Sequence, residues 1–201
     1  MLRRIIDLTL GLKHHTHRRW LTKEARAELT AWSLLAENFN GKALFLAEQW
    51  ESSEHLNMYT DASNLGFGGG GMLGTKWFSS EWNKEWLKFH ITIRELFPIV
   101  LAIQLWGGLL RNKCVQFHTD NIAVVYIINK QTSKDPTIMI LVRRLVLLIL
   151  KFNILFKASH IAGIKNIAAD QLSRLQIQQF KREFPHMDSA PTIVVPDMQT
   201  L

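Results

Sequence analysis

The spacing of apolar residues changes near position 55. Before it, apolar side chains recur every three or four residues, as in Leu21–Gly41, and strand-like alternation is absent, so residues 1–54 are predicted to be helical. After it, short apolar runs typical of strands alternate with longer helical stretches. We predict strands at His55–Asp61, Gly66–Leu73, Lys76–Ser79, Val115–Thr119 and Asn153–Ser159, and helices at Ile91–Arg111, Asn121–Lys130, Thr137–Lys151 and Asn166–Phe180.

The predicted order from residue 55 onward is β-β-β-α-β-α-α-β-α. Strands that alternate with helices late in a chain indicate a mixed sheet whose last strands are parallel. Beyond Pro185 the sequence is polar and contains prolines, which is typical of a linker. We therefore predict a small helical segment at 1–54, an α/β domain at 55–184, and a flexible tail or linker at 185–201.

A run of glycines follows the first predicted strand. Gly66–Gly71 satisfies the G-x-G-x-x-G pattern of dinucleotide-binding loops, and Gly69–Lys76 nearly matches a phosphate-binding loop. Both loops require a helix after the glycines, whereas more strand follows here, and Gly74-Thr75-Lys76 has the wrong order for a Gly-Lys-Ser/Thr ending. We expect antiparallel strands with a bulge, where glycine permits close approach of the backbone.

Four acids occupy comparable places. Asp61 and Asp120 lie on or just after predicted strands, and Glu95 and Asp170 lie near the starts of predicted helices. An acid at a helix start can simply complement the helix dipole, which is an alternative for Glu95 and for Asp170. Together, however, strand ends and helix starts converge in such sheets, and clustered carboxylates are hard oxygen ligands suited to Mg²⁺ or Mn²⁺. Two such ions can catalyse hydrolysis of a phosphodiester.

Charge and composition narrow the classes of partner. The chain has 201 residues, a net charge of +7 and a pI near 9.7, which indicate either a solvated basic surface or a polyanionic partner such as nucleic acid. The single Cys114 excludes an internal disulfide. The most apolar run, Ile138–Leu150, is interrupted by arginines and is shorter than the ~20 residues of a membrane span. No secretory leader is recognisable, so we predict an intracellular protein, in nucleus or cytoplasm, without a membrane partner.

Four short motifs carry the acids in the order TDAS, REL, HTDN and AADQLSR. The segment HIAGIKNIAADQLSR adds His160, which precedes Asp170 by ten residues, with Gly163 and Asn166 between them. In this order and spacing the chain resembles the type-1 ribonuclease H domain of reverse transcriptases from DIRS-type and related gypsy-like retrotransposons. The resemblance covers residues 55–185, and residues 1–54 resemble the segment that joins the polymerase thumb to that domain.

The resemblance implies a ribonuclease H-like five-stranded mixed sheet flanked by helices. It implies that two Mg²⁺ or Mn²⁺ ions are cofactors, that Asp61 is shared by both ions, and that His160 lies in a mobile loop and assists proton transfer or product release. The reaction would be endonucleolytic hydrolysis of the RNA strand of an RNA–DNA hybrid, leaving 5′-phosphate and 3′-hydroxyl ends. The implied metal-binding carboxylates are Asp61, Glu95, Asp120 and Asp170.

The implied partners are an RNA–DNA hybrid and a polymerase domain, since the polymerase motif Tyr-x-Asp-Asp is absent from this chain. Discrimination of the hybrid would come from contacts to RNA 2′-hydroxyl groups. We predict substrate contacts from polar residues beside the motifs and from two basic residues. These residues are Ser63, Asn121, Asn166, Lys130 and Arg143.

Two other functions remain open from the sequence. One is a catalytically inactive nucleic-acid-binding or subunit-contact domain derived from such an element, which the missing polymerase motif favours. The other is a transposase or integrase built on the same sheet. Those enzymes use three acids, and the His160–Asp170 spacing would then be unexplained.

Overall fold

The structure is a computed structural model that describes residues 3–14, 16–38, 50–52, 58–72 and 75–192. From β2 to α6 the order of elements confirms the predicted β-β-β-α-β-α-α-β-α. The helices and strands are α1 (Arg3–Thr9), α2 (Lys23–Asn38), β1 (Trp50–Ser52), β2 (Tyr59–Ala62), β3 (Gly66–Met72), β4 (Lys76–Glu81), α3 (Ile91–Trp106), β5 (Cys114–Thr119), α4 (Ile122–Lys130), α5 (Pro136–Phe152), β6 (Leu155–His160), α6 (Ile167–Ser173) and α7 (Ile177–Glu183), with short 3₁₀ turns at Trp86–Lys88, Gly107–Leu110 and Gly163–Lys165.

The strands form two three-stranded sheets among the described residues, so the prediction of one five-stranded mixed sheet is wrong here. Strands β2, β3 and β4 are antiparallel, whereas β5 lies between β1 and β6 and is parallel to both. The parallel pairing of β5 with β6 was predicted. Strand β1 was not, because Trp50–Ser52 lies in the segment predicted to be wholly helical. It pairs with Cys114–Gln116, the first half of β5.

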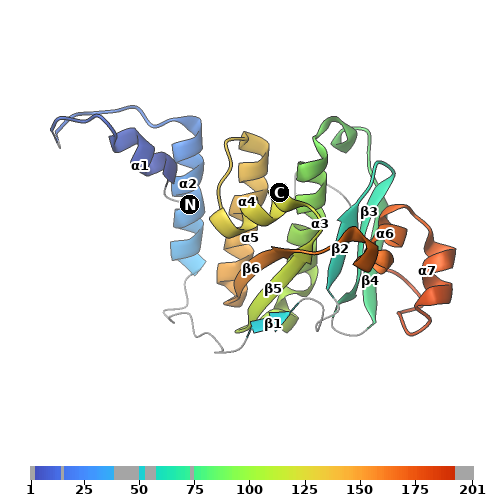
Figure 1. Cartoon of the computed structure of the whole chain (residues 1–201). Coiled ribbons are helices and arrows are strands. Elements are labelled where there is room, and N and C mark those ends of the chain that lie inside the picture. The colour runs from blue at the N-terminus through green and yellow to red at the C-terminus, as the bar shows by residue number, and fades with distance from the viewer. Residues whose placement is uncertain (1–2, 15, 39–49, 53–57, 73–74, 193–201) are drawn as a thin grey trace.

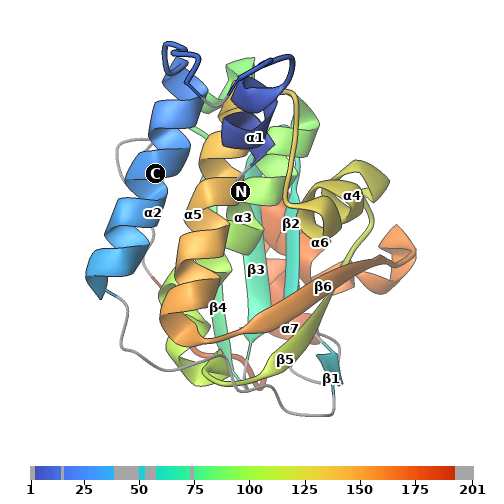
Figure 2. The same ribbon diagram turned by 90° about the vertical axis from the view of Figure 1, so that its left-hand side faces the viewer.

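The helices cover the strands in layers (Figures 1 and 2). Helix α3 packs on one face of the β2–β3–β4 sheet, and α6 packs on the opposite face, next to α7. Helix α5 lies between α3 and α2, so α2 packs on the rest of the protein through α5, and Arg4 of α1 donates to the backbone oxygen of Ser133 just before α5. This arrangement places one sheet, which carries Asp61, between the helices that carry Glu95 and Asp170.

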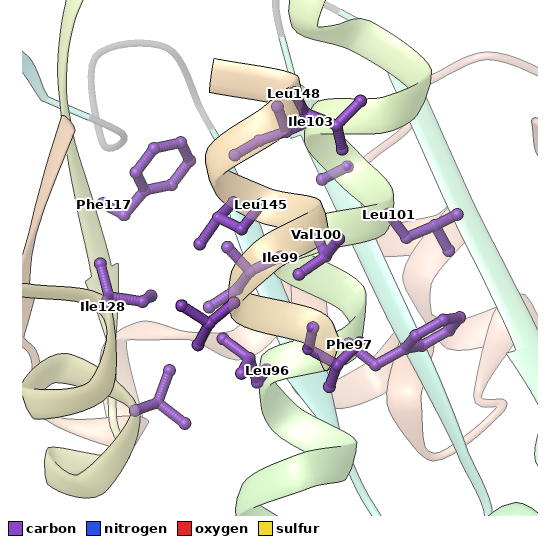
Figure 3. Packing of buried hydrophobic residues seen from close by; sticks show 14 of the residues in the cluster. Leu96, Phe97, Ile99, Val100, Leu101, Ile103, Phe117, Ile128, Leu145 and Leu148 are labelled. Carbon is purple, nitrogen blue, oxygen red and sulfur yellow. The ribbon is translucent and has the colours of Figure 1, made fainter. Parts of the chain in front are cut away.

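The main core surrounds α3. Figure 3 shows its apolar side chains meeting those of α5, α4 and β5. The stretch Ile91–Leu110 is long and apolar enough to cross a membrane, but 72% of it is buried inside the protein, which is typical of a core helix. The labelled core residues are Leu96, Phe97, Ile99, Val100, Leu101, Ile103, Phe117, Ile128, Leu145 and Leu148.

The predicted final helix, Asn166–Phe180, is two helices. Helix α6 ends at Ser173 and α7 begins at Ile177. Between them Leu175 has a φ of +61°, a left-handed conformation that L-residues other than glycine and asparagine seldom adopt. The sequence offers no glycine or proline at this point, so its pattern conceals the break. The break lets α7 turn back onto α6 and β4.

Part of the predicted tail belongs to the folded domain. The backbone N–H groups of Asp188 and Thr192 donate to the carbonyl oxygens of Thr75 and Trp77 on either side of Lys76, at 2.8 and 2.7 Å. The indole N–H of Trp77 donates to the carbonyl oxygen of Asp188 at 2.7 Å. These contacts satisfy polar groups along the edge of β4, so the linker prediction is wrong as far as residue 192, and 193–201 lie outside the described residues.

Candidate functional site

Asp61 sits in the middle of β2, opposite Gly68 of β3. The glycines of β3 have the geometric role that the sequence predicts: β3 is antiparallel to both neighbours, with an irregularity in register between Gly70 and Met72. The glycines of β3 also leave room for a helix to pack on the strand. A Cβ atom on Gly68 would lie 2.5 Å from the Cβ atom of Leu172 in α6. The glycine run therefore allows α6 to pack directly against the strand beside Asp61.

The structure brings the four predicted acids into one electrostatic cluster. Asp61 comes from β2, Glu95 from α3 and Asp170 from α6, and Asp120 directly follows β5. Asp61 interacts electrostatically with Asp120 and Asp170, and Glu95 interacts with Asp120 and Asp61. Asp61 therefore interacts with each of the other three acids. The helix-dipole alternative does not account for this convergence from separate elements.

The cluster raises two pKa values. The pKa of Glu95 rises from 4.5 to about 7, chiefly because burial disfavours the charged form; repulsion by Asp120 adds to the rise, and a hydrogen bond from Asn121 opposes it. The pKa of Asp61 is also raised, first by burial and then by repulsion from Asp120, against a hydrogen bond from Ser173. Each raised pKa means that burial and the neighbouring acids disfavour the negative charge on the carboxylate. A bound cation would favour that charge.

The residues present fit a hard divalent cation in their chemistry. All four acids offer oxygen ligands, and the buried Oε2 atom of Glu95 has no hydrogen-bond partner among the described residues. In the part of the chain that the structure describes, no three His, Cys, Asp or Glu side chains already lie close enough together to hold one ion. An ion bound here would have to draw the carboxylates closer together.

His160 lies beside Asp120 at the edge of the cluster. Its Nε2 atom is 3.1 Å from the backbone oxygen of Asp120, and its side chain is exposed. It is the last residue of β6 and not part of the following loop, where the resemblance places it. Gly163 in the next turn also approaches Asp120, because a Cβ atom there would lie 3.1 Å from Oδ2 of that acid. An exposed imidazole at this point is available for proton transfer.

Two of the predicted substrate residues cap or brace local structure. The Oδ1 atom of Asn121 accepts from the backbone N–H groups of Ala123 and Val124 and so caps α4, while its side chain also bonds to Glu95. The hydroxyl of Ser63 donates to the backbone oxygen of Ser173 at 2.8 Å. Both side chains therefore have internal partners beside the acids.

The other three predicted substrate residues differ in exposure. Asn166 is 3% exposed, and its Nδ2 atom donates to the backbone oxygen of Thr60 at 3.1 Å, so it supports β2 from inside the protein. Arg143 is half-buried and directs its guanidinium toward the backbone of α2 at Glu24. Lys130, at the end of α4, is exposed to solvent and alone of the three retains the position that a phosphate contact needs.

Sequence reasoning missed two residues that hold the acids in place. The hydroxyl of Ser173 donates to Oδ2 of Asp61 at 2.7 Å, and Nε of Arg174 donates to Oδ1 of Asp170 at 2.8 Å. For Arg174 the signal was present in AADQLSR, since a residue four positions after Asp170 shares its face of a helix. The bond of Ser173 to Asp61 joins segments far apart in the sequence and has no such local signal.

Comparison with known proteins gives weak similarities. No family model matches the sequence, and no curated protein matches it significantly. Among solved structures, ribonuclease H1 from Halobacterium salinarum NRC-1 is 15% identical with a TM-score of 0.48, covering 65% of this chain and 99% of that protein. The protease–reverse transcriptase of prototype foamy virus is 13% identical with a TM-score of 0.34, covering 79% of this chain and 21% of that protein. Both TM-scores are too low to establish a shared fold or function.

The raised pKa of Glu95 predicts an unusual dependence of stability on pH. A raised folded-state pKa stabilises the fold below the unfolded pKa near 4.5, and that stability is lost as pH rises through about 7. In EDTA, the free energy of unfolding should fall by roughly 2 kcal/mol from pH 5 to pH 8, after allowing for solvent screening. Urea titrations at both pH values measure it. Glu95→Gln should lose this difference; an equal difference in the variant would assign it to other groups.

Proposed function

We propose that this protein is an endonuclease that hydrolyses the RNA strand of RNA–DNA hybrids with two Mg²⁺ or Mn²⁺ ions. The observation that carries the proposal is the position of Asp61, which interacts with all three other acids from separate elements. Asp61 would be shared by both ions, and the other ligands would be Glu95, Asp120 and Asp170. When bound, the ions would activate the attacking water and stabilise the leaving oxygen.

The protein's own side chains would orient these ligands and move a proton. The bond from Ser173 fixes Oδ2 of Asp61, and Asn121 fixes Glu95 from the capped start of α4. His160 would exchange a proton with the reacting oxygen or assist release of the product, since it lies exposed beside Asp120. Cleavage would leave a 5′-phosphate and a 3′-hydroxyl.

The net charge of +7 supports a polyanionic substrate. Lys165 ends the 3₁₀ turn that approaches Asp120, and Lys130 ends α4, the helix that follows Asp120; both are exposed. These cations would contact phosphates, while RNA would be distinguished from DNA through its 2′-hydroxyl groups. We further propose that the domain derives from a reverse transcriptase of a DIRS-type or gypsy-like retrotransposon, with a polymerase domain as its partner and residues 1–54 as its connecting segment.

A panel of end-labelled duplexes tests the proposal. With Mg²⁺, the protein should cleave the RNA strand of an RNA–DNA hybrid internally and leave an all-DNA duplex of the same sequence intact. EDTA should abolish cleavage, and an all-RNA duplex controls for contaminating ribonucleases. Equal cleavage of hybrid and RNA duplex, or cleavage that persists in EDTA, would contradict the assignment.

His160→Ala should slow turnover of the hybrid by about 10²-fold or less, as expected for one group in proton transfer. Multiple-turnover and single-turnover rates, measured on the same preparation, separate proton transfer from product release: a defect confined to multiple turnover assigns release. His186→Ala is the matched control, because that histidine lies in the C-terminal segment beyond α7. A loss far above 10²-fold would make His160 a metal ligand and not a proton carrier.

Two observations favour a second function, a nucleic-acid-binding domain without catalysis. Asp170 forms an ion pair with Arg174 at 2.8 Å. Among the described residues, no three of the acids lie close enough together to bind one ion. Under this alternative the hybrid would bind without being cleaved. Hybrid binding measured beside the duplex panel separates the two: tight binding with no cleavage at any Mg²⁺ or Mn²⁺ concentration assigns the inactive domain.

A further inference from the structure

The C-terminal end of α6 is bonded to the sheet by serine hydroxyls. Ser79 on β4 donates to the backbone oxygen of Leu172 at 2.7 Å, and Ser63, just after β2, donates to the backbone oxygen of Ser173 at 2.8 Å. Carbonyl groups in the last turn of a helix lack their regular partners within the helix. Here hydroxyl groups from two neighbouring segments bond to carbonyls of this turn, although that of Leu172 also accepts from the backbone N–H of Leu175 at 3.2 Å. The helix end is thereby attached to the sheet at two points.

A third serine joins the same helix end to the acid cluster. Ser173 is fully buried, and its hydroxyl donates to Oδ2 of Asp61 at 2.7 Å; the backbone oxygen of Asp170, at 2.9 Å, is an alternative acceptor for the same hydrogen. A hydrogen bond to an ionised carboxylate is stronger than one to a neutral carbonyl. The hydroxyl therefore links Asp61 on the strand to the helix that carries Asp170.

Strand β3, which is rich in glycine, allows the end of α6 to pack closely against the sheet. With no side chain at Gly68, Leu172 packs against the backbone of β3, and Gly68 is itself paired with Ser79 on β4. The helix end is thus held by contact with β3 and by hydrogen bonds from β4 and from the turn after β2. Its position relative to Asp61 is fixed from several directions.

We propose that Ser63, Ser79 and Ser173, here called the serine clamp, set the separation of Asp61 and Asp170 and thereby the affinity of the site for divalent metal. The inference rests on the proposed function, because it assigns these serines as positioning residues for that metal site. It also gives Ser63 a role different from the substrate contact predicted from the sequence. The clamp acts on ligand geometry and not on binding of the hybrid.

Ser79→Ala is the informative variant. The hydroxyl of Ser79 bonds to a helix carbonyl and not to a carboxylate, so any effect on the metal has to pass through α6. Ser80→Ala is the matched control, since it removes the same atom from the next residue of β4, where the hydroxyl reaches only the backbone of Glu81 at 3.4 Å. Ser79→Thr keeps a hydroxyl at the critical position.

Calorimetric titration of Mn²⁺ into the full chain, without substrate, measures the predicted effect. Ser79→Ala should weaken metal binding about 5-fold, as for loss of one hydrogen bond, with Ser80→Ala unchanged and Ser79→Thr close to wild type. In hybrid cleavage at fixed Mg²⁺, Ser79→Ala should lower kcat and leave KM unchanged. Amide hydrogen exchange should show faster exchange in α6 of the metal-free variant.

The outcomes separate the two proposals. If wild type binds Mn²⁺ and cleaves the hybrid but Ser79→Ala matches Ser80→Ala in metal affinity, the clamp inference is wrong, whatever the change in melting temperature. If wild type neither binds metal nor cleaves, the proposed function fails and the clamp inference fails with it. Should Ser79→Ala not fold, Ser63→Ala removes the other hydroxyl that holds the end of α6; because that hydroxyl also accepts from the backbone N–H groups of Leu65 and Gly66, Ser63→Thr, which keeps the hydroxyl, is then the matched control.

Discussion

Asp61→Asn is expected to lower the rate of hybrid cleavage by at least about 10³-fold without destabilising the protein. A shared metal ligand contributes several kcal/mol to stabilising the transition state, and an amide is a poor substitute for a carboxylate. Stability should hold or rise, since the pKa of Asp61 is raised by burial and by its acidic neighbours. Asparagine removes that repulsion and can still accept the bond from Ser173.

Single-turnover cleavage and thermal unfolding in EDTA, on the same preparation, measure both halves of this expectation. Glu81→Gln is the matched control, because it neutralises an exposed acid on β4 away from the cluster. It should leave both quantities near wild type. Loss of activity in Asp61→Asn accompanied by a lower melting temperature would mean that the variant is misfolded, and the catalytic role would then be unsupported.

Gly68→Ala is expected to destabilise the protein by about 3 kcal/mol, near the upper range for overpacking a core. The new methyl group would lie 2.5 Å from the Cβ atom of Leu172 and 2.9 Å from its backbone carbon, so the helix has to shift as a whole. Because α6 carries Asp170, cleavage should fall even where the variant is fully folded.

Urea denaturation measures this loss. Gly108→Ala is the matched control, because a Cβ atom there meets nothing within 4 Å, and its effect should stay within about 0.5 kcal/mol. Equal stabilities for the two variants would show that the contact between β3 and α6 is looser than the structure indicates.

The acid cluster could be predicted from the sequence because each acid lies within or next to an element whose apolar residues have a clear period. The strand before Asp120 and the apolar helix around Glu95 both have strong local patterns, and the order of elements follows from them. The glycine run was also interpretable, since the residues after it continue a strand. The sequence did not show what packs against this strand. In the structure β3 contacts helix α6 and pairs with β2 and β4.

The pairing of distant strands and the break in the final helix could not be predicted from the sequence. Strand β1 has three residues, too few to show alternation, and its pairing with β5 joins segments more than 60 positions apart. At the break between α6 and α7, Leu175 has a left-handed backbone conformation, which a leucine in the sequence does not predict. Polar residues near the acids were predicted to contact substrate, but Asn166 faces inward. The prediction failed for Asn166 because sequence spacing does not tell whether an amide side chain meets solvent or a backbone carbonyl inside the protein.

The central claim is that the four acids form a metal-dependent centre that cuts RNA in a hybrid. The measurement that tests it most directly is the single-turnover cleavage rate of an end-labelled RNA–DNA hybrid as a function of Mg²⁺ concentration, for wild type and Asp61→Asn prepared side by side. We predict that cleavage by wild type rises from zero with Mg²⁺ and saturates, while the variant stays at background. Equal metal-dependent cleavage by both proteins, or none by wild type at any Mg²⁺ concentration, would contradict this account.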